Sequence, residues 1–414
     1  MKRFLIAEVL VIAAFVVGFF VGKASNSGKA KYENYYDEAE TTWAKAQKAD
    51  VPPVTLDDAD AERIKKVRAL YREVFDRYPE SRWADDAIYQ LASRIARTDE
   101  EAFALYRKLI NNYPDSEWAD DALYTIAIAY YRIAEETKQN EGKAEGTDTY
   151  YDRAFALFDQ LIRDYPGSVL ADESQFNKAM CYYGKGNWSR ALEEFDKLRE
   201  EFRGTELVHS LVYYTGMILT EKQDYKNARI EFMNVVDSGH PELAPLAQFG
   251  IAQTFFAEGQ YEKAIESYEK VISNWPESKT AADSHFYTGW VYEKMNKYDE
   301  AIAQLEGAID KYPRNENARN AQFYIAQIYY AKSDTEGAIE AYRKVAENQT
   351  FDYDTRRAAQ FWIGQIYEKN GNISQAVKEY QKLLKEFPEP HLALRHPSND
   401  INENYIQKLQ AGNL

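Results

Sequence analysis

The chain has 414 residues, which is too many for one ordinary core and indicates several domains or a repeat array. Its 51 lysines and arginines stand against 67 aspartates and glutamates, and a net charge of −16 repels phosphate backbones, which excludes nucleic acid as an expected partner. The single cysteine, Cys181, excludes an internal disulfide and a four-cysteine metal site, and so thiol-poor a chain suits an oxidising compartment.

The first predicted element is an apolar run from Phe4 to Gly22, interrupted by a single glutamate. As a helix it would span about 30 Å, the thickness of the hydrocarbon core of a bilayer. The run is longer than the apolar region of a typical signal peptide, and no lipobox cysteine follows it. We therefore predict an uncleaved single-pass anchor over residues 1–23, with a cleaved signal as the alternative. The basic start at Lys2 and Arg3 favours an inner-membrane protein whose body lies in the periplasm or otherwise outside the cytoplasm.

Two features of this run bear on assembly. Ala14, Gly18 and Gly22 are spaced by four, a pattern that lets membrane helices approach closely and would pair two copies, although small residues are common in such helices in any case. The sequence FLIAE at its start also resembles processed type IV prepilins, but an arginine stands where their processing needs glycine. A filament or another large assembly therefore stays open as an alternative.

Residues 24–56 are predicted to form a linker with one further helix, from Tyr32 to Ala49. Pro52 and Pro53 separate this helix from the rest of the chain, because proline ends a helix.

From residue 57 to residue 390 one pattern returns at a period of about 37 residues. Its clearest slot holds alanine, at Ala102, Ala154, Ala191, Ala228, Ala264, Ala301, Ala338 and Ala376. Four residues after each alanine stands a large residue, at Tyr106, Phe158, Phe195, Phe232, Tyr268, Leu305, Tyr342 and Tyr380. A second small slot precedes the alanine, by twelve residues in most repeats, at Ala92, Ala127, Ala179, Gly216, Ala252, Gly289, Ala326 and Gly364.

This spacing predicts helix hairpins. Residues four apart share a helix face, so the alanine gives room and the large residue fills it. The earlier small slot lies on the preceding helix, where it lets the two helices cross closely, and the turn between them often carries glycine, as at Gly186, Gly259 and Gly371. A single hairpin cannot bury its apolar stripes alone, whereas a stack can. We predict an all-α solenoid of about eight or nine hairpins.

The joints between hairpins share a second pattern, a proline followed two residues later by serine or asparagine. They read YPES, YPDS, YPGS, WPES and YPRN, and they end at Ser81, Ser116, Ser168, Ser278 and Asn315. The proline is predicted to end one helix and the serine or asparagine to cap the next. With its helix hairpins, the chain resembles the tetratricopeptide repeat family, whose usual period is about 34 residues. The longer repeat and these joints resemble its envelope branch, which includes outer-membrane assembly lipoproteins and the periplasmic coordinator of the Tol–Pal system. The resemblance implies a right-handed α-solenoid.

The pattern has three departures. Residues 135–149 are a polar insertion that is predicted to form a loop. The joint FRGT, which ends at Thr205, lacks the proline. After Pro390 the pattern stops, so residues 391–414 are predicted to form either a short cap on the last hairpin or a loose tail.

No group of residues indicates catalysis. The sequence has no HExxH, CxxC or glycine-rich phosphate loop, and His391 and His396 have a spacing that suits a metal poorly. The paired aspartates at 85–86 and 120–121 fall in predicted first helical turns, where the helix dipole favours acids. Cys181 stands beside two tyrosines and is expected to pack. We therefore predict a non-enzymatic protein without a metal or a cofactor.

The family resemblance implies that the first helix of each hairpin lines a concave groove that receives a protein or peptide partner. The matching slots hold aromatic residues and glutamines, of which we predict these for partner binding: Tyr183, Phe249, Gln253, Phe256, Trp290, Phe323, Gln327, Tyr330, Phe361 and Gln365. Aromatic side chains supply contact area, and amides can bond a peptide backbone. The phrases AQFGIAQ, AQFYIAQ and AQFWIGQ even place glutamine on both sides of the aromatic residue. The alternative is that these aromatic residues serve the packing of the repeat itself.

Together these observations predict a membrane-anchored scaffold or adaptor outside the cytoplasm, which mediates protein–protein interactions in cell-envelope assembly. The anchor would raise the local concentration of the repeats at the membrane. The alternatives are a structural subunit of a large membrane-associated or filamentous assembly and a periplasmic holdase-like chaperone. A scaffold would bind one or two fixed partners, whereas a chaperone would bind many unfolded chains.

Overall fold

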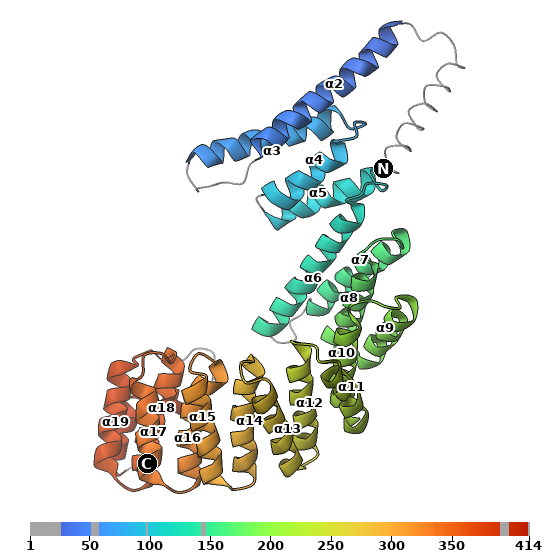
Figure 1. The fold of residues 1–414 in the computed structure, drawn as a ribbon. Coiled ribbons are helices and arrows are strands. Elements are labelled where there is room, and N and C mark those ends of the chain that lie inside the picture. Colours follow the sequence, from blue (N-terminus) through green and yellow to red (C-terminus); the bar gives the residue numbers. More distant parts are fainter. Residues whose placement is uncertain (1–25, 51–57, 97, 142–145, 390–396, 413–414) are drawn as a thin grey trace. The chain divides into compact units, whose positions relative to one another are not determined.

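The computed structural model describes residues 26–50, 58–96, 98–141, 146–389 and 397–412. The secondary structure of these residues is helical, with no strand among them, as the repeat predicts (Figure 1). The chain divides into two compact units, of which unit 1 ends at Thr205 and unit 2 begins at Glu206.

The described part of unit 1 holds four consecutive hairpins, in which α2 pairs with α3, α4 with α5, α6 with α7 and α8 with α9. A π-helical turn, η1, continues α4. The bounds are α2 Asn26–Ala49, α3 Asp58–Arg77, α4 Ala84–Gln90, η1 Leu91–Ile95, α5 Asp99–Asn112, α6 Ala119–Glu141, α7 Thr147–Asp164, α8 Ala171–Gly184 and α9 Trp188–Glu201.

The described part of unit 2 holds five hairpins, from α10 with α11 to α18 with α19, followed by a 3-10 turn and a short last helix. The bounds are α10 Val208–Glu221, α11 Tyr225–Ser238, α12 Leu243–Ala257, α13 Tyr261–Asn274, α14 Lys279–Lys294, α15 Tyr298–Lys311, α16 Glu316–Ala331, α17 Thr335–Glu347, α18 Tyr353–Lys369, α19 Ile373–Glu386, η2 Pro397–Asp400 and α20 Glu403–Gln410.

The small slot and the large residue meet inside the hairpins whose small slot holds glycine, which confirms the packing that the repeat predicts there. A Cβ atom added to Gly364 would lie 2.5 Å from the ring of Tyr380, and one added to Gly216 would lie 2.7 Å from the ring of Phe232. These rings are completely buried. The glycine therefore lets the two helices of a hairpin cross closely enough to enclose an aromatic ring.

The predicted serine caps are only partly correct. Ser278 and Asn315 do cap their helices, because each side chain accepts a hydrogen bond from the backbone N–H three residues later, at 3.1 Å. The helices after Ser81, Ser116 and Ser168 begin three residues later instead. In these joints a tryptophan or leucine follows the serine by two residues, as Trp118 does, which stacks on Tyr89 at 4.4 Å and donates to Asp86. This packing holds the segment as a turn before the helix begins.

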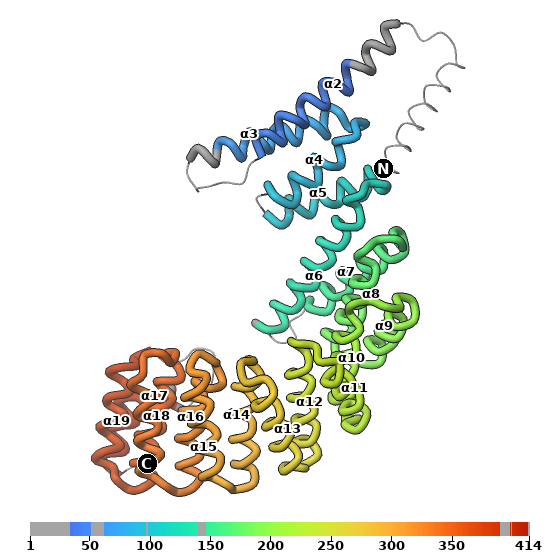
Figure 2. The backbone as a smooth tube through the Cα atoms, viewed as in Figure 1, coloured from blue at the N-terminus to red at the C-terminus, as the bar shows by residue number. Residues whose placement is uncertain are grey.

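Two predicted connecting segments contain helix in the residues that the structure describes. The segment 24–56 contains α2, whose Ala39 and Ala46 are completely buried in the core that it shares with α3, so this helix is half of the first hairpin rather than part of a linker. Residues 135–141 of the insertion at 135–149 extend α6, which continues to Glu141 (Figure 2).

The C-terminal segment forms a cap. Helix α20 packs on α19, and Ile406 and Leu409 are buried in the core of the last hairpin. Arg357 of α18 is also buried, and it donates to the carbonyl oxygens of Phe387 and Ser398. Of the two expectations for this segment, a cap or a loose tail, the described residues fit the cap.

The predicted localisation is corrected by the structure. Among the described residues, no helix combines the length and the apolar character that crossing a membrane requires. This finding contradicts the expectation of a single-pass inner-membrane protein with its repeats in the periplasm. The run from Phe4 to Gly22, with its predicted packing residues Ala14 and Gly18, lies outside the described residues.

Candidate protein-binding face

The first helices of consecutive hairpins in unit 2 lie beside one another. Helix α12 contacts both α10 and α14, and α14 contacts α16 (Figure 1). We call the surface formed by α10, α12, α14, α16 and α18 the first-helix face. All but one of the residues predicted for partner binding lie on these helices. The exception is Tyr183, which lies on α8 in unit 1, half-buried and 5.3 Å from the ring of Trp188.

One aromatic group forms between α12 and α14. The ring of Phe256 lies 4.7 Å from that of Trp290, and Phe249 lies 5.3 Å from Tyr287, which itself stands 6.0 Å from Trp290. All four side chains are half-buried. The Nζ atom of Lys294 lies 5.7 Å from the centre of the Trp290 ring. We call these four residues the Trp290 group.

A second group forms between α16 and α18. Tyr330 lies 6.4 Å from Trp362, and its hydroxyl accepts a hydrogen bond from Lys369 at 3.1 Å. Phe323 of α16 packs within its own hairpin, 5.2 Å from Tyr342. Gln327, on the same helix, is exposed, and Gln253 of α12 is half-buried. We call Tyr330, Trp362 and Lys369 the Tyr330 group.

Two of the predicted residues serve mainly the last hairpin. Phe361 is only 2% exposed and packs against Tyr380, so its ring belongs to the core. Gln365 donates a hydrogen bond to the hydroxyl of Tyr380 at 2.9 Å. These contacts fit the alternative in which the aromatic residues of the first helices, such as Phe249, Phe323 and Phe361, serve the packing of the repeat itself. We call their shared position in the repeat the aromatic slot.

The glutamines that precede the aromatic slot also have an internal role. Gln175, Gln248 and Gln360 are buried, and each donates to a backbone carbonyl oxygen of the second helix in its hairpin, at 2.9–3.2 Å. The acceptor stands 19 residues further along the chain in every case. In AQFGIAQ and AQFWIGQ the earlier glutamine is therefore buried and the later one is half-buried, whereas in AQFYIAQ Gln322 is half-buried and Gln327 is exposed.

Sequence reasoning missed Tyr287 and Trp362, which complete the two aromatic groups. Both directly follow a residue of the aromatic slot, namely Phe286 and Phe361. The recurrence of a large ring at this next position, again in Tyr324, is the signal that could have identified them.

Burial raises the pKa of three tyrosines near this face. Burial, with a smaller effect from Glu293, raises the pKa of Tyr324 to about 12. Burial likewise raises the pKa of Tyr268 and of Tyr342. Neutral rings and amides can hold a peptide by contact area and hydrogen bonds.

Cys181 packs as the sequence predicts. The side chain is 1% exposed in the core around Ala127, Tyr151 and Phe158. Burial strongly raises the pKa of its thiol, which makes the side chain a poor nucleophile. Within the described residues, no three histidine, cysteine or acidic side chains come together as ligands for a metal.

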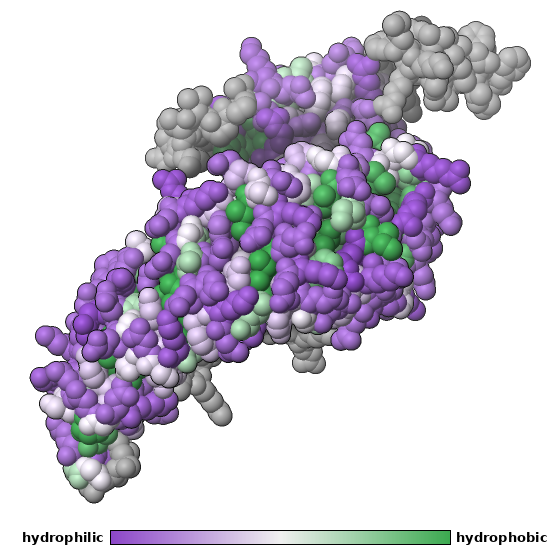
Figure 3. All heavy atoms as spheres, turned by 60° about the horizontal axis from the view of Figure 1, so that its bottom comes forward, coloured by the Kyte–Doolittle hydropathy of each residue, from purple (hydrophilic) through white to green (hydrophobic). Residues whose placement is uncertain are grey.

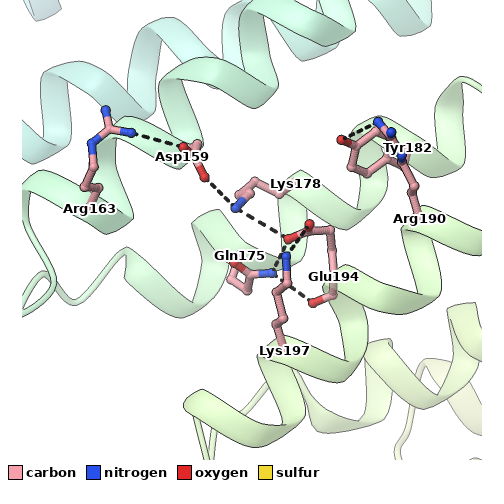
Figure 4. Close-up of polar contacts among 8 residues, drawn as sticks. All are labelled: Asp159, Arg163, Gln175, Lys178, Tyr182, Arg190, Glu194 and Lys197. Atoms are coloured by element: carbon pink, nitrogen blue, oxygen red, sulfur yellow. Dashed lines mark hydrogen bonds and ion pairs between the residues drawn. The ribbon is translucent and has the colours of Figure 1, made fainter.

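Unit 1 encloses a charged cluster where α7, α8 and α9 meet. Figure 4 shows the Nζ atom of Lys178 between Asp159, at 2.7 Å, and Glu194, at 3.4 Å. Glu194 also accepts hydrogen bonds from Gln175 and Lys197, both at 2.8 Å. Lys178 and Glu194 are each 6% exposed. Lys178 stands in a slot that holds isoleucine or threonine in the repeats of unit 2, so this cluster replaces an apolar contact between helices.

On the face shown in Figure 3, the surface of the described residues is mainly hydrophilic. In the view of Figure 3, hydrophobic residues occur in several separate groups among polar ones. The large hydrophobic side chains that are exposed in unit 2 include Val208, Leu246, Ile230 and Met233.

Comparison with known proteins gives the class of this fold. Sequence profiles described as tetratricopeptide repeat match residues 86–116, 140–206, 243–314, 288–353 and 358–390, which together make up more than half of the chain. No curated protein matches the chain.

Several solved structures are similar in fold. The C-terminal part of a tetratricopeptide repeat-containing protein from Cytophaga hutchinsonii is 19% identical, covers 63% of this chain and 96% of its own, and gives a TM-score of 0.45. A tetratricopeptide repeat protein from Parabacteroides merdae is 13% identical, with coverages of 69% and 98% and a TM-score of 0.39. A signal transduction ATPase with a tetratricopeptide repeat sensor from Pyrococcus horikoshii is 17% identical, with coverages of 90% and 55% and a TM-score of 0.48.

The fold and the profiles together define an all-α helical repeat protein. The chain belongs to the tetratricopeptide repeat family. Such repeats generally mediate protein–protein interactions, and proteins built from them are generally non-enzymatic scaffolds.

Proposed function

We propose that this protein is a scaffold or adaptor that binds a segment of a partner protein on the first-helix face of unit 2. The observation that carries the proposal is the Trp290 group, in which four half-buried rings come together from two neighbouring helices. Large aromatic side chains that are held by their neighbours lose little conformational freedom on binding, and such residues often dominate binding energy.

The mode of binding follows from the side chains on this face. The Trp290 group and the Tyr330 group would each receive an apolar side chain of the partner. Gln327 is exposed on α16 and would bond the partner's backbone, because a primary amide both donates and accepts. Multiple weak contacts along several repeats would then add up to one specific complex.

A role in assembling a cell envelope is a finer part of this proposal. It rests on the resemblance of the Tyr-Pro-x-Ser joints alone, and the identity of the partner tests it. The number of partners separates a scaffold, which has one or two, from a holdase-like chaperone, which has many.

The test places a photo-crosslinking amino acid at Gln327 in the full chain, in its own cells, and identifies the adducts by mass spectrometry. We expect one or two proteins to be captured, and we expect the double variant Trp290→Ala/Tyr330→Ala to lose them. The matched control carries the crosslinker at Glu340, whose side chain is 74% exposed on α17, and should capture neither protein.

Equal capture at both positions would contradict the proposal, as would capture that survives the double substitution. Loss of the adducts counts only if the variant folds, which its circular dichroism and melting temperature establish. A broad set of unrelated adducts would favour the chaperone instead.

A further inference from the structure

A pocket in unit 1 carries two arginines at the junction of three helices. It is lined by Arg107 of α5, Tyr130 of α6, and Arg153, Ala156 and Leu157 of α7, and its volume is about 510 Å³. These residues all belong to unit 1, whereas the first-helix face belongs to unit 2.

Tyrosine rings hold both guanidinium groups. Arg107 donates a hydrogen bond to the hydroxyl of Tyr130 at 2.9 Å. The guanidinium carbon of Arg153 lies 5.5 Å from the centre of the Tyr130 ring and 5.9 Å from that of Tyr150. The two rings are themselves stacked, 6.3 Å apart and 22° from parallel. A guanidinium that rests on aromatic rings loses less freedom when it binds an anion.

The two arginines have no carboxylate partner among the described residues. Several other arginines of unit 1 do have one: Arg68 and Arg72 pair with Glu101, Arg94 with Asp50, and Arg163 with Asp159. Two such cations line one pocket and give it a local positive charge in a chain whose net charge is −16. Both side chains are exposed, so their N–H groups point where a ligand can reach them.

We propose that this pocket binds an acidic segment of a partner protein, with one or two carboxylates on Arg107 and Arg153 and an apolar side chain against Leu157 and Ala156. A guanidinium presents a planar fork of donors that matches a carboxylate. The apolar floor supplies the contact area that a bare inorganic anion would not use. The negative charge of the whole chain disfavours a long polyanion, which would meet repulsion beyond the pocket.

The experiment selects peptides from a random twelve-residue phage library on the immobilised full chain, after depletion of the library on the double variant Arg107→Gln/Arg153→Gln. The sequences that remain are expected to share aspartate or glutamate beside an apolar residue. Fluorescence polarisation with one such peptide should then show binding at least tenfold weaker to the double variant, because each lost charge-assisted contact costs about tenfold.

Two further variants make the result decisive. Arg132→Gln/Arg199→Gln removes the same charge from exposed arginines of unit 1 and should change the affinity by less than twofold. Arg107→Lys/Arg153→Lys keeps the charge but loses the fork, and it should bind several-fold more weakly than the wild type while its melting temperature is unchanged.

Three outcomes would overturn the proposal. The selected peptides could lack acidic residues, or the control pair could weaken binding as much as the pocket pair does. Inorganic phosphate at millimolar concentration could displace the peptide, which would make a phosphate group the ligand instead of a carboxylate.

Discussion

Among the described residues, six turns between paired helices place a residue in the left-handed region of backbone conformation at the same position relative to the alanine slot. Three of them use glycine, at Gly186, Gly259 and Gly371, with φ between 71° and 73°. The other three use Gln223, Asn296 and Ser333, with φ between 58° and 64°. All six stand five residues before the alanine slot. A residue other than glycine loses about 1–2 kcal/mol of stability in this region. The turns at Gln223, Asn296 and Ser333 therefore retain strain that glycine would avoid.

The substitution Ser333→Gly should therefore stabilise unit 2. We expect the free energy of unfolding to rise by about 0.5–1 kcal/mol, because relief of strain exceeds the extra entropy of glycine in the unfolded chain. Urea denaturation measures the change. The reverse substitution, Gly259→Ala, is the control, since a Cβ atom there meets nothing within 4 Å and only the backbone is strained. It should destabilise the protein by about 1 kcal/mol. If neither substitution changed the free energy of unfolding, the left-handed backbone would not strain these turns.

At the scale of single residues, the sequence predicts some roles and conceals others. The alanine slot and the large residue after it could be predicted because side-chain size alone decides their packing. The two glutamines of AQFWIGQ have the same chemistry, yet Gln360 is completely buried and Gln365 is not. The difference depends on the rotation of α18 about its axis against α19, which no single repeat specifies.

At the scale of the element, the tyrosine of the joint links a hairpin to the preceding one. The hydroxyl of Tyr113 donates to the carbonyl oxygen of Pro79, that of Tyr165 to Pro114, and that of Tyr312 to Pro276, at 2.8–2.9 Å. Each acceptor is the proline of the preceding joint. Successive joints are thus tied together by one side chain, a contact that crosses from one hairpin to the next and is invisible to a search for helix periodicity.

Tyr312→Phe removes one such tie and little else. The carbonyl oxygen of Pro276 would lose its partner, and we expect unit 2 to lose about 1 kcal/mol of stability, the usual net value of such a hydrogen bond. Tyr298→Phe removes an exposed hydroxyl whose hydrogen bond is to nearby Asn296. This variant should therefore lose less than half as much stability as Tyr312→Phe. Chemical denaturation of the two variants side by side decides between a structural tie and an incidental contact.

The charged cluster of α7, α8 and α9 should make unit 1 sensitive to acid. Burial opposes the ionisation of Glu194, but hydrogen bonds from Lys197 and Gln175 and the charge of Lys178 outweigh it and lower the pKa of this carboxyl. A carboxyl with a lowered pKa in the folded state contributes stability above its unfolded value, about 4.3, and this contribution disappears as the pH falls through the folded value. Glu194→Gln should therefore destabilise unit 1 at pH 7, by about 2–3 kcal/mol, and the difference should shrink below about pH 4.

The matched control for this prediction lies in unit 2. Glu379 accepts a hydrogen bond from buried Gln360 at 2.8 Å, as Glu194 does from Gln175, but its ion pair is with the half-exposed Arg343 at 3.7 Å. Glu379→Gln leaves no buried cation behind and should cost about 1 kcal/mol or less. Hydrogen exchange that is resolved by helix, in α7–α9 and in α17–α19, would measure each effect in its own unit. If Glu194→Gln and Glu379→Gln lowered the stability of their units equally, the burial of Lys178 would have no energetic consequence.

At the scale of the whole molecule, the repeat predicts the number of hairpins but not how they group. Eight or nine hairpins are expected from the sequence, and the described residues form nine, because α2 adds a hairpin that the alanine slot does not mark. The division after Thr205 coincides with the joint FRGT, which lacks the proline. The missing proline can be seen in the sequence, but it does not by itself predict a division between units. The packing of the helices before and after a joint decides that, and the sequence of the joint does not specify this packing.

Stability in a repeat protein is passed from neighbour to neighbour, so the cap should matter most to the hairpin that it covers. Ile406 of α20 is 5% exposed in the last core. The substitution Ile406→Asp puts a charge there and should cost about 3 kcal/mol or more, because an unpaired charge cannot stay buried. We expect hydrogen-exchange protection to fall most in α18 and α19 and progressively less toward α10.

Gln407→Asp is the control, since it adds the same charge one residue later at an exposed position and should leave protection unchanged. A uniform loss of protection from α10 to α19 in Ile406→Asp would show that unit 2 unfolds as a single cooperative block. A graded loss would show that its hairpins behave as linked but separable units. In that case a partner that contacts only α16 and α18 would stabilise mainly the C-terminal hairpins, and their protection would report its binding.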